Sequence, residues 1–195
     1  MQAWIALLLD GRLGEAALTA ARLREQGFDV YLTRSLDRAF AYVRERYLAQ
    51  TEKRYGLLAS SKAKNLSAHG IRNSFNFTKN FREGPWYNDA PDSDHSCCQL
   101  KEVATEFACQ GLELDYPIMA WGDDLTWSHM AWSSPPQPRS KAQNPHRLRL
   151  NSYRVLLSRG RDGMTIFVPP TTSMDITYDA LLSAGLPELW VRTLE

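Results

Sequence analysis

The spacing of apolar residues divides the first quarter of the chain into helix, strand and helix. Between residues 3 and 26, apolar and small side chains recur at helical intervals, and Gly27 suits a helix C-cap. Residues 28–32 form a short β-prone run. A second helical stripe follows, with Ser35 as its N-cap and Asp37 in its first turn, where an acid is favoured. The stripe consists of Leu36, Phe40, Val43 and Tyr47.

Short apolar runs predict further strands in the rest of the chain. They lie at residues 55–59, 103–107, 118–121 and 165–168. Residues 150–158 have the pattern of a helix, and a last helix is indicated by Tyr178, Leu181 and Leu182. Two stretches lack a clear period. Residues 68–98 are polar, aromatic and turn-rich, and residues 133–146 contain several prolines, which predicts a loop or an insertion.

Short apolar strands that alternate with helices predict an α/β fold, a parallel sheet covered by helices on both faces. The length of 195 residues fits one domain or one domain with a small appendage. In such sheets functional residues gather where strands end. We therefore expect functional side chains near Ser60-Ser61-Lys62, Gln110-Gly111 and Pro169-Pro170, each of which follows a predicted strand.

Composition adds one local feature to this picture. The hydrophobic fraction of 44%, the charged fraction of 23% and the net charge of +1 are ordinary for a globular protein. The segment from His146 to Arg161, however, contains five arginines and no acid, and such basic segments favour phosphate. The alternative is a solvated arginine face. The arginines are Arg147, Arg149, Arg154, Arg159 and Arg161.

Cysteine usage and hydropathy limit the class of protein. Three cysteines, Cys97, Cys98 and Cys109, make a poor disulfide framework and indicate a reducing compartment, so we expect a cytoplasmic protein. Two adjacent cysteines rarely both reach one tetrahedral ion, and we predict no metal site. The acid pair Asp123-Asp124 is more typical of a solvated turn than of a metal site. The apolar run at residues 3–9 predicts a buried helix rather than a signal peptide, and no run is long enough to cross a membrane.

Three segments carry a more specific signal because they occur in a fixed order. They are RYGLLASSKAKNL at residues 54–66, TEFACQGLELD at residues 105–115 and NSYRVLLSRGR at residues 151–161. With these segments, and from residue 4 to the tail, the chain resembles the Schlafen group 3-like DNA/RNA helicase family. The part that it resembles is the C-terminal motor domain, which is the second RecA-like domain of a superfamily 1 helicase.

The resemblance implies a P-loop NTPase-type fold and a role for each motif. It implies Arg159, with Arg161 beside it, as the catalytic arginines that stabilise charge on a transferred phosphoryl group. Gln110, Gly111 and Glu113 are implied as nucleotide-binding residues, with Glu113 accepting a hydrogen bond from the ribose. Nucleic-acid-binding residues implied in the same way are Ser60, Ser61, Lys62 and Thr105.

Ordinary structural roles are open for each of these motifs. Arg159 could cap a helix C-terminus, where the dipole favours a cation. Gln110-Gly111 could be a plain turn, and Ser60 to Lys62 a polar strand end. Phe107 stands where many helicases of this kind have a histidine, and an aromatic ring there could stack on a base.

A matching phosphate-binding loop is missing from the chain. No Gly-x-x-x-x-Gly-Lys-Ser/Thr pattern occurs in the 195 residues. We therefore expect half of a motor, which uses ATP with Mg²⁺ only together with an N-terminal P-loop domain in cis or in trans, and which does not hydrolyse ATP alone. Met1 stands close to where such a domain would begin. The expected partner is single-stranded DNA or RNA.

The expected organisation is a single second RecA-like domain over residues 1–195. It comprises a helical lead-in at 1–50, a motif-bearing core at 51–170 and a tail at 171–195. A catalytically silent module that binds nucleic acid or protein is the alternative function. A small-molecule enzyme is disfavoured, because the four histidines are scattered and no nucleophile–base pair is evident.

Overall fold

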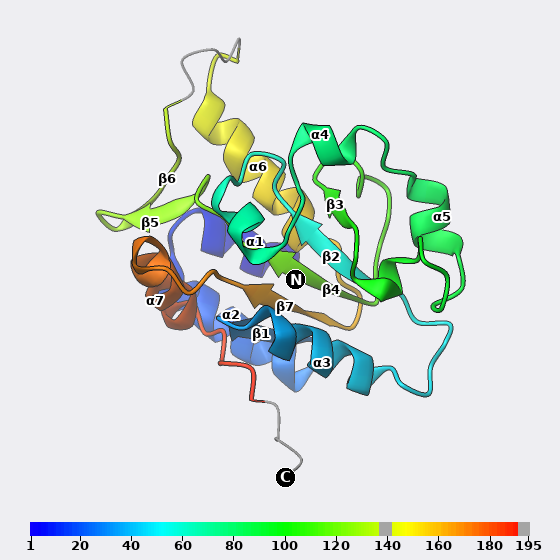
Figure 1. The fold of residues 1–195 in the computed structure, drawn as a ribbon. Helices are drawn as coiled ribbons and strands as arrows, with labels where there is room; N and C mark the ends of the chain where they lie inside the picture. Colours follow the sequence, from blue (N-terminus) through cyan, green and yellow to red (C-terminus); the bar gives the residue numbers. More distant parts are fainter. Residues whose placement is uncertain (137–141, 191–195) are drawn as a thin grey trace.

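A five-stranded parallel sheet forms the centre of the molecule, in the strand order β1-β7-β4-β2-β3 (Figure 1). The computed structural model describes residues 1–136 and 142–190. The strands of this sheet are β1 (Asp29–Thr33), β2 (Tyr55–Ala59), β3 (Val103–Thr105), β4 (Tyr116–Ala120) and β7 (Gly163–Phe167). A separate antiparallel hairpin consists of β5 (Thr126–Ser128) and β6 (Ala131–Ser133).

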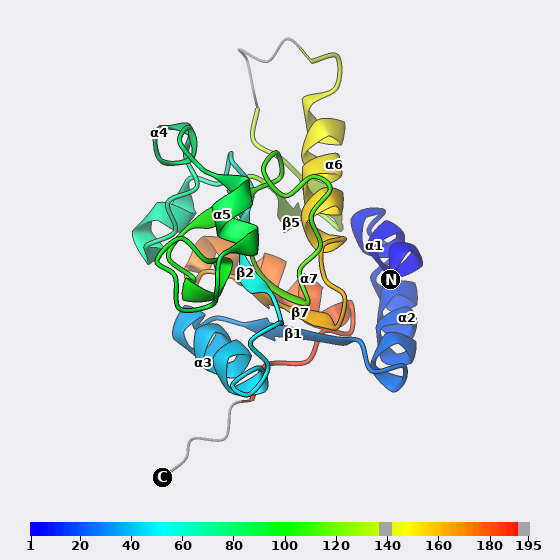
Figure 2. The same ribbon diagram turned by 90° about the vertical axis from the view of Figure 1, so that its right-hand side faces the viewer.

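Helices cover both faces of the sheet (Figure 2). One face is covered by α1 (Gln2–Leu9), α2 (Leu13–Glu25) and α6 (Pro145–Leu157), and the other by α3 (Leu36–Arg46). Beside α2 and β5 lies α7 (Asp175–Ser183), after the short turn η3 (Thr172–Met174). Shorter helical pieces connect β2 to β3: η1 (Asn65–His69), α4 (Phe75–Thr78), α5 (Glu83–Asn88) and η2 (Cys97–Gln99).

Alternation along the strands produces two apolar layers. Leu58, Met119 and Ile166 pack toward α1, α2 and α6, while their neighbours Leu57 and Ile118 pack toward α3. All five side chains are buried, because helices cover both faces. Burying one such side chain contributes about 1.5–3 kcal/mol. The predicted α/β class with helices on both faces is therefore confirmed.

Most predicted elements occur within two or three residues of their expected bounds. The strand at residues 55–59 is confirmed without a shift. Ser35 caps α3 as predicted, since its hydroxyl accepts a hydrogen bond from the Arg38 N–H at 3.2 Å. The last helix is also confirmed as α7. Of the predicted tail, residues 191–195 lie outside the described part of the chain.

Three local predictions are wrong. One helix was expected at residues 3–26, but Gly11 adopts φ +76° and separates α1 from α2. The predicted loop at 133–146 begins within strand β6, and its last residues belong to α6, which starts at Pro145 rather than at residue 150. Proline is well tolerated in a first helical turn, where its missing N–H has no partner to lose. Residues 137–141 of that loop lie outside the described residues.

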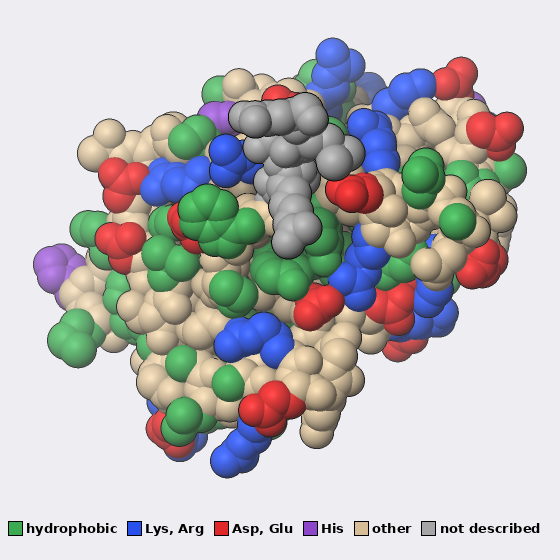
Figure 3. Space-filling model, turned by 90° about the horizontal axis from the view of Figure 1, so that it is seen from below, with side chains coloured by type: hydrophobic (Ala, Val, Ile, Leu, Met, Phe, Trp, Pro, Cys, Tyr) green, Lys and Arg blue, Asp and Glu red, His purple; other side chains and the backbone are tan. Residues whose placement is uncertain are grey.

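Charges of both signs are interspersed on the face seen from below in Figure 3, and neither sign forms a continuous field there. This face therefore gives no electrostatic indication of a nucleic-acid interface. None of the helices within residues 1–136 and 142–190 combines the length and the apolar character that crossing a membrane requires.

Candidate functional site

Three parallel strands end side by side and bring separate motifs together at the carboxyl edge of the sheet. Ala59 of β2 pairs with Thr105 of β3 and with Ala120 of β4. The residues that follow these strand ends therefore meet in space, although they lie far apart in the sequence. Ser60 follows β2, and Glu106 follows β3.

Arg149 of α6 reaches into this edge and joins the three strand ends. Its Nη1 donates to Ser60 Oγ at 2.8 Å and lies 3.5 Å from Glu106 Oε1. Its Nε lies 3.0 Å from Asp124 Oδ2, an ion pair whose angle is outside that of a hydrogen bond. All four residues are buried, and Arg149 is 4% exposed. The arginine thus provides a cation shared by two carboxylates that would otherwise be costly to bury.

Asp124 receives further support from a buried tyrosine. Tyr153, one helical turn after Arg149, donates to Asp124 Oδ1 at 2.7 Å and accepts from the Gly122 N–H at 3.1 Å. Ser60 Oγ donates to the other carboxylate oxygen at 2.5 Å. Burial raises the pKa of Asp124, and these hydrogen bonds and Arg149 oppose that rise. The sequence interpretation of Asp123-Asp124 as a solvated turn is therefore wrong for Asp124, which is buried.

The loop after β2 is held in place by its neighbours. Asp123 Oδ1 accepts from the Lys64 N–H at 2.8 Å, and Asn73 Nδ2 donates to the Ser60 carbonyl at 2.6 Å. Gly122 lies so close to this loop that a Cβ at its position would be 2.1 Å from the Ala63 Cβ. A side chain at Gly122 would therefore force the loop away from β4.

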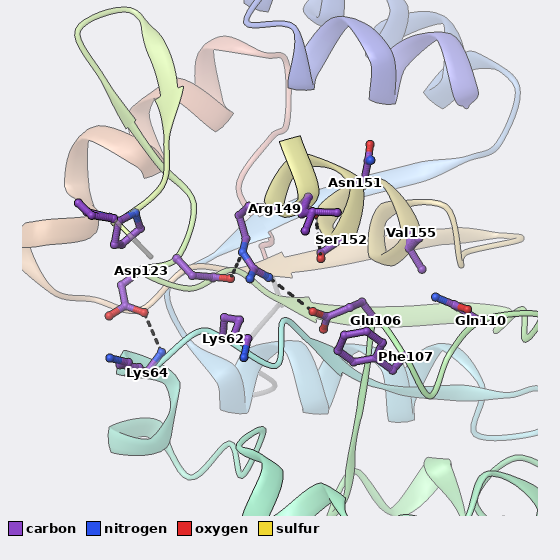
Figure 4. Close-up of a pocket in the computed structure, with 14 residues that line it drawn as sticks. Lys62, Lys64, Glu106, Phe107, Gln110, Asp123, Arg149, Asn151, Ser152 and Val155 are labelled. Carbon is purple, nitrogen blue, oxygen red and sulfur yellow. Dashed lines mark hydrogen bonds and ion pairs between the residues drawn. The ribbon is translucent and has the colours of Figure 1, made fainter. Parts of the chain in front are cut away.

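A cavity of about 1060 Å³ opens beside this network, between α6 and residues 106–110 (Figure 4). Lys62 and Lys64 come from the loop after β2, and Phe107 and Gln110 from the segment after β3. Leu148, Asn151, Ser152 and Val155 line it from α6, with Pro135 and Pro136 from the segment that precedes this helix.

A second group of motif residues meets at the opposite, amino edge of the sheet. Leu114 N–H donates to the Arg159 carbonyl at 2.8 Å, and Arg161 N–H donates to the Leu114 carbonyl at 2.9 Å. These bonds place the turn at 110–113 beside residues 159–161, just before β4 and β7 begin. Gly111 adopts φ +79°, which favours glycine, and the side chains of Glu113 and Arg161 form an ion pair at 2.9 Å.

The guanidinium of Arg159 is turned onto protein carbonyls. Nη1 donates to Leu112 O at 3.0 Å and to Cys109 O at 3.3 Å, and Nε donates to Val155 O at 3.0 Å. Val155 lies in the last turn of α6, and its carbonyl also accepts from the Ser158 N–H at 3.2 Å and from the Ser158 hydroxyl at 2.9 Å. It also ties α6 to the turn that carries Gly111 and Glu113.

The predicted nucleic-acid residues differ in their access to a ligand. Ser60 and Thr105 are buried, and Ser61 donates to Glu106 Oε1 at 3.0 Å. Lys62 is exposed and lines the cavity, as does Gln110. The structure thus brings Lys62 and Gln110 to one cavity, and Glu113, Arg159 and Arg161 to the opposite edge.

Arg149, Asp124, Tyr153 and Glu106 were not predicted from the sequence as residues of a site. A signal was present, because Arg149, Tyr153 and Leu156 recur at helical spacing and so share one face of α6. An arginine on the same helical face as buried residues is a candidate for an inward ion pair. The other arginines of the helix, Arg147 and Arg154, are exposed.

No set of three His, Cys, Asp or Glu residues within the described ranges has the geometry to hold a metal ion. The three cysteines are free and buried, and burial raises the pKa of the Cys109 thiol to about 12.

A parallel sheet between two helical layers, with motif residues at both strand edges, defines a RecA-like α/β domain. Over residues 1–170 the sequence matches the family described as Schlafen group 3, DNA/RNA helicase domain, and the chain belongs to this family. No curated protein matches it.

Proposed function

We propose that this domain is the second half of an ATP-dependent nucleic-acid motor. In this proposal Gly111, Glu113, Arg159 and Arg161 face an ATP molecule that a P-loop domain, in cis or in trans, holds with Mg²⁺. The observation that carries the proposal is the convergence of residues 111–114 and 159–161 at the amino edge of the sheet. A cytoplasmic location is part of the same proposal.

The residues present fit one wall of a nucleotide site, but not a complete site. Gly111 permits a close approach of backbone to phosphate, and the Glu113 carboxylate can accept from a ribose hydroxyl. An arginine supplied across a domain cleft stabilises the charge that spreads over a transferred phosphoryl group. The ATP with its Mg²⁺ would supply the reacting phosphoryl group, while the loop that cradles the phosphates is missing from the 195 residues.

Arg159 needs to change partners to perform this role. In the structure its three guanidinium nitrogens donate to Val155, Leu112 and Cys109 carbonyls and to the Ser158 hydroxyl. These are neutral acceptors, and a phosphate bearing full charges is a stronger one. A nucleotide at the amino edge would therefore compete well for the guanidinium.

The first test uses ATP hydrolysis with and without a P-loop domain. We expect no turnover from the chain alone. With the P-loop domain supplied, Arg159→Ala should lower kcat by about 10³-fold or more, with a small change in KM. Arg154→Ala, at an exposed position of the preceding helix α6, is the matched control and should leave kcat within about twofold. Turnover by the purified chain alone that disappears in Arg159→Ala would overturn the proposal.

A catalytically silent binding module is the second candidate, and the engaged state of Arg159 favours it. The two candidates differ in one outcome. A silent module would bind single-stranded nucleic acid in a salt-dependent manner, and Glu113→Ala or Arg159→Ala would change no activity even when a P-loop domain is present.

A further inference from the structure

The cavity beside Arg149 has two walls of different chemistry. Lys62 and Lys64 come from the loop after β2 (Figure 4). The other groups are apolar side chains and amides: Phe107 and Gln110 from the segment after β3, and Leu148 and Asn151 from α6. Most of the surface around this opening is apolar. A site that binds only the phosphate backbone of a nucleic acid needs mainly cationic groups. The apolar and amide groups of this cavity therefore indicate a ligand that also has a part other than phosphate.

The carboxylates that line the cavity are engaged by donors of the protein itself. Glu106 accepts from the Ser61 N–H at 2.8 Å and pairs with Arg149. Asp123 accepts from the Lys64 N–H at 2.8 Å. In the described part of the chain, no carboxylate lies within ion-pair distance of the Lys62 or Lys64 ammonium groups, which leaves both positive charges to a ligand.

Phe107 supplies the most unusual surface of the cavity. Its side chain is 69% exposed, although Thr105 and Glu106 before it and Cys109 after it are buried. Leu148 on α6 is also exposed, at 53%. Large apolar side chains that remain in water beside a cavity favour a ligand that covers them. Flat rings with hydrogen-bonding edges suit an aromatic face accompanied by amides.

We propose that this cavity binds unstacked bases of a single strand, with a base stacked on Phe107 and the adjoining phosphates at Lys62 and Lys64. Gln110 would then donate to or accept from a base edge, and Asn151, whose Oδ1 accepts from Arg154 at 2.8 Å, would donate from its Nδ2. This inference rests on the proposed nucleic-acid function and adds that affinity depends on bases as well as on the backbone. The volume of about 1060 Å³ exceeds what a drug-sized ligand needs, so it accommodates more than one nucleotide.

The test compares two oligonucleotides of equal length and charge by fluorescence anisotropy. One is a 12-residue oligothymidylate, and the other has abasic sugars in place of every thymidine. The protein should bind the first at least about 10-fold more tightly, since stacking of a base on an aromatic side chain is worth about this factor or more. Phe107→Ala should remove most of this preference and leave the affinity for the abasic strand unchanged.

Two variants make the result specific to the cavity. Phe75→Ala removes another exposed aromatic ring, on α4, which does not line the cavity, and it should leave both affinities unchanged. Lys62→Ala should weaken the binding of both oligonucleotides by the same factor. It should also reduce the salt dependence of the affinity by the equivalent of about one phosphate contact. Since Phe107 and Lys62 are exposed, folding should be preserved, as a thermal melt of each variant checks.

The outcomes separate this inference from the function on which it rests. Equal affinity for the two strands, with a loss in Lys62→Ala, would overturn base binding while keeping nucleic-acid binding. No binding of either strand at low salt would overturn both. A preference for the thymidylate strand that survives Phe107→Ala would also overturn the proposed site.

Discussion

The two edges of the central sheet carry charges in opposite environments. At the carboxyl edge Arg149, Glu106 and Asp124 lie in the interior, and their side chains are 5–6% exposed. At the amino edge the side chains of Arg161 and Glu113 are 53% and 57% exposed. The same kind of ion pair is thus part of the folded framework at one edge and a surface contact at the other. Charges at the first edge fix shape, while those at the second are free to exchange partners.

One helix connects these two environments. Arg149 lies in the second turn of α6, and Arg159 lies two residues beyond its last residue. The segment after β3 runs beside α6 and is held at both ends, at Glu106 by Arg149 and at Leu112 by Arg159. The cavity between α6 and this segment is therefore bounded by the same two elements that lead to Gly111 and Arg159.

The largest effect should come from removing Arg149. Arg149→Met keeps an apolar stem of similar length but leaves two buried carboxylates without a cation. We expect the free energy of unfolding in urea to fall by about 3–5 kcal/mol. Arg154→Met, at an exposed position of the same helix, should change it by less than about 0.5 kcal/mol. A loss below about 1 kcal/mol for Arg149→Met would show that water reaches the carboxylates and that the two edges are alike.

A smaller effect should appear in the pH dependence of stability. Burial raises the pKa of Asp124 in the folded state, so the folded protein holds this proton more tightly than the unfolded chain does. The stability gained from that proton is present below the unfolded pKa of about 3.9 and is lost as pH rises through the folded pKa.

The measurement compares urea unfolding of the wild type with that of Asp124→Asn between pH 3 and pH 7. The wild type should lose stability relative to the variant as pH rises above about 4, and the difference should then level off. A wild type that instead gains relative stability with rising pH would mean that Arg149, Ser60 and Tyr153 outweigh burial, and that the folded pKa is lowered.

The fold was largely predictable because its strands are short apolar runs between polar turns. Residues 55–59 form β2 as expected, and the carboxyl edges of β2 and β3 were predicted to carry functional side chains. The break at Gly11 was missed because helical periodicity continues on both sides of it. The hairpin of β5 and β6 was missed because it depends on Trp127 and Trp132 packing edge to face with ring centroids 5.0 Å apart, a contact that no local pattern reveals.

The candidate site was predictable only where a motif marks it. The turn at 110–113 and Arg159 were located by sequence, and the structure brings them together. The buried position of Arg149 was not predicted, because the sequence does not distinguish it from the other four arginines of this segment. The difference appears only when the helix is packed on the sheet. Likewise, Asp124 is next to Asp123 in sequence, but only Asp124 is buried.

The smallest effect is expected at the amino edge, where Glu113 pairs with Arg161. We expect a double-mutant cycle with Glu113→Ala and Arg161→Ala, measured on the free energy of unfolding, to give a coupling energy of about 0.5 kcal/mol or less. Both side chains are exposed to water, so their attraction is screened. Adding 1 M salt should reduce this value further. A coupling above about 1 kcal/mol that resists salt would make the amino edge as fixed as the carboxyl edge. Weak coupling is what the proposed nucleotide contact requires. If Glu113 and Arg161 were held strongly together, their ion pair would have to be broken before either side chain could contact the nucleotide.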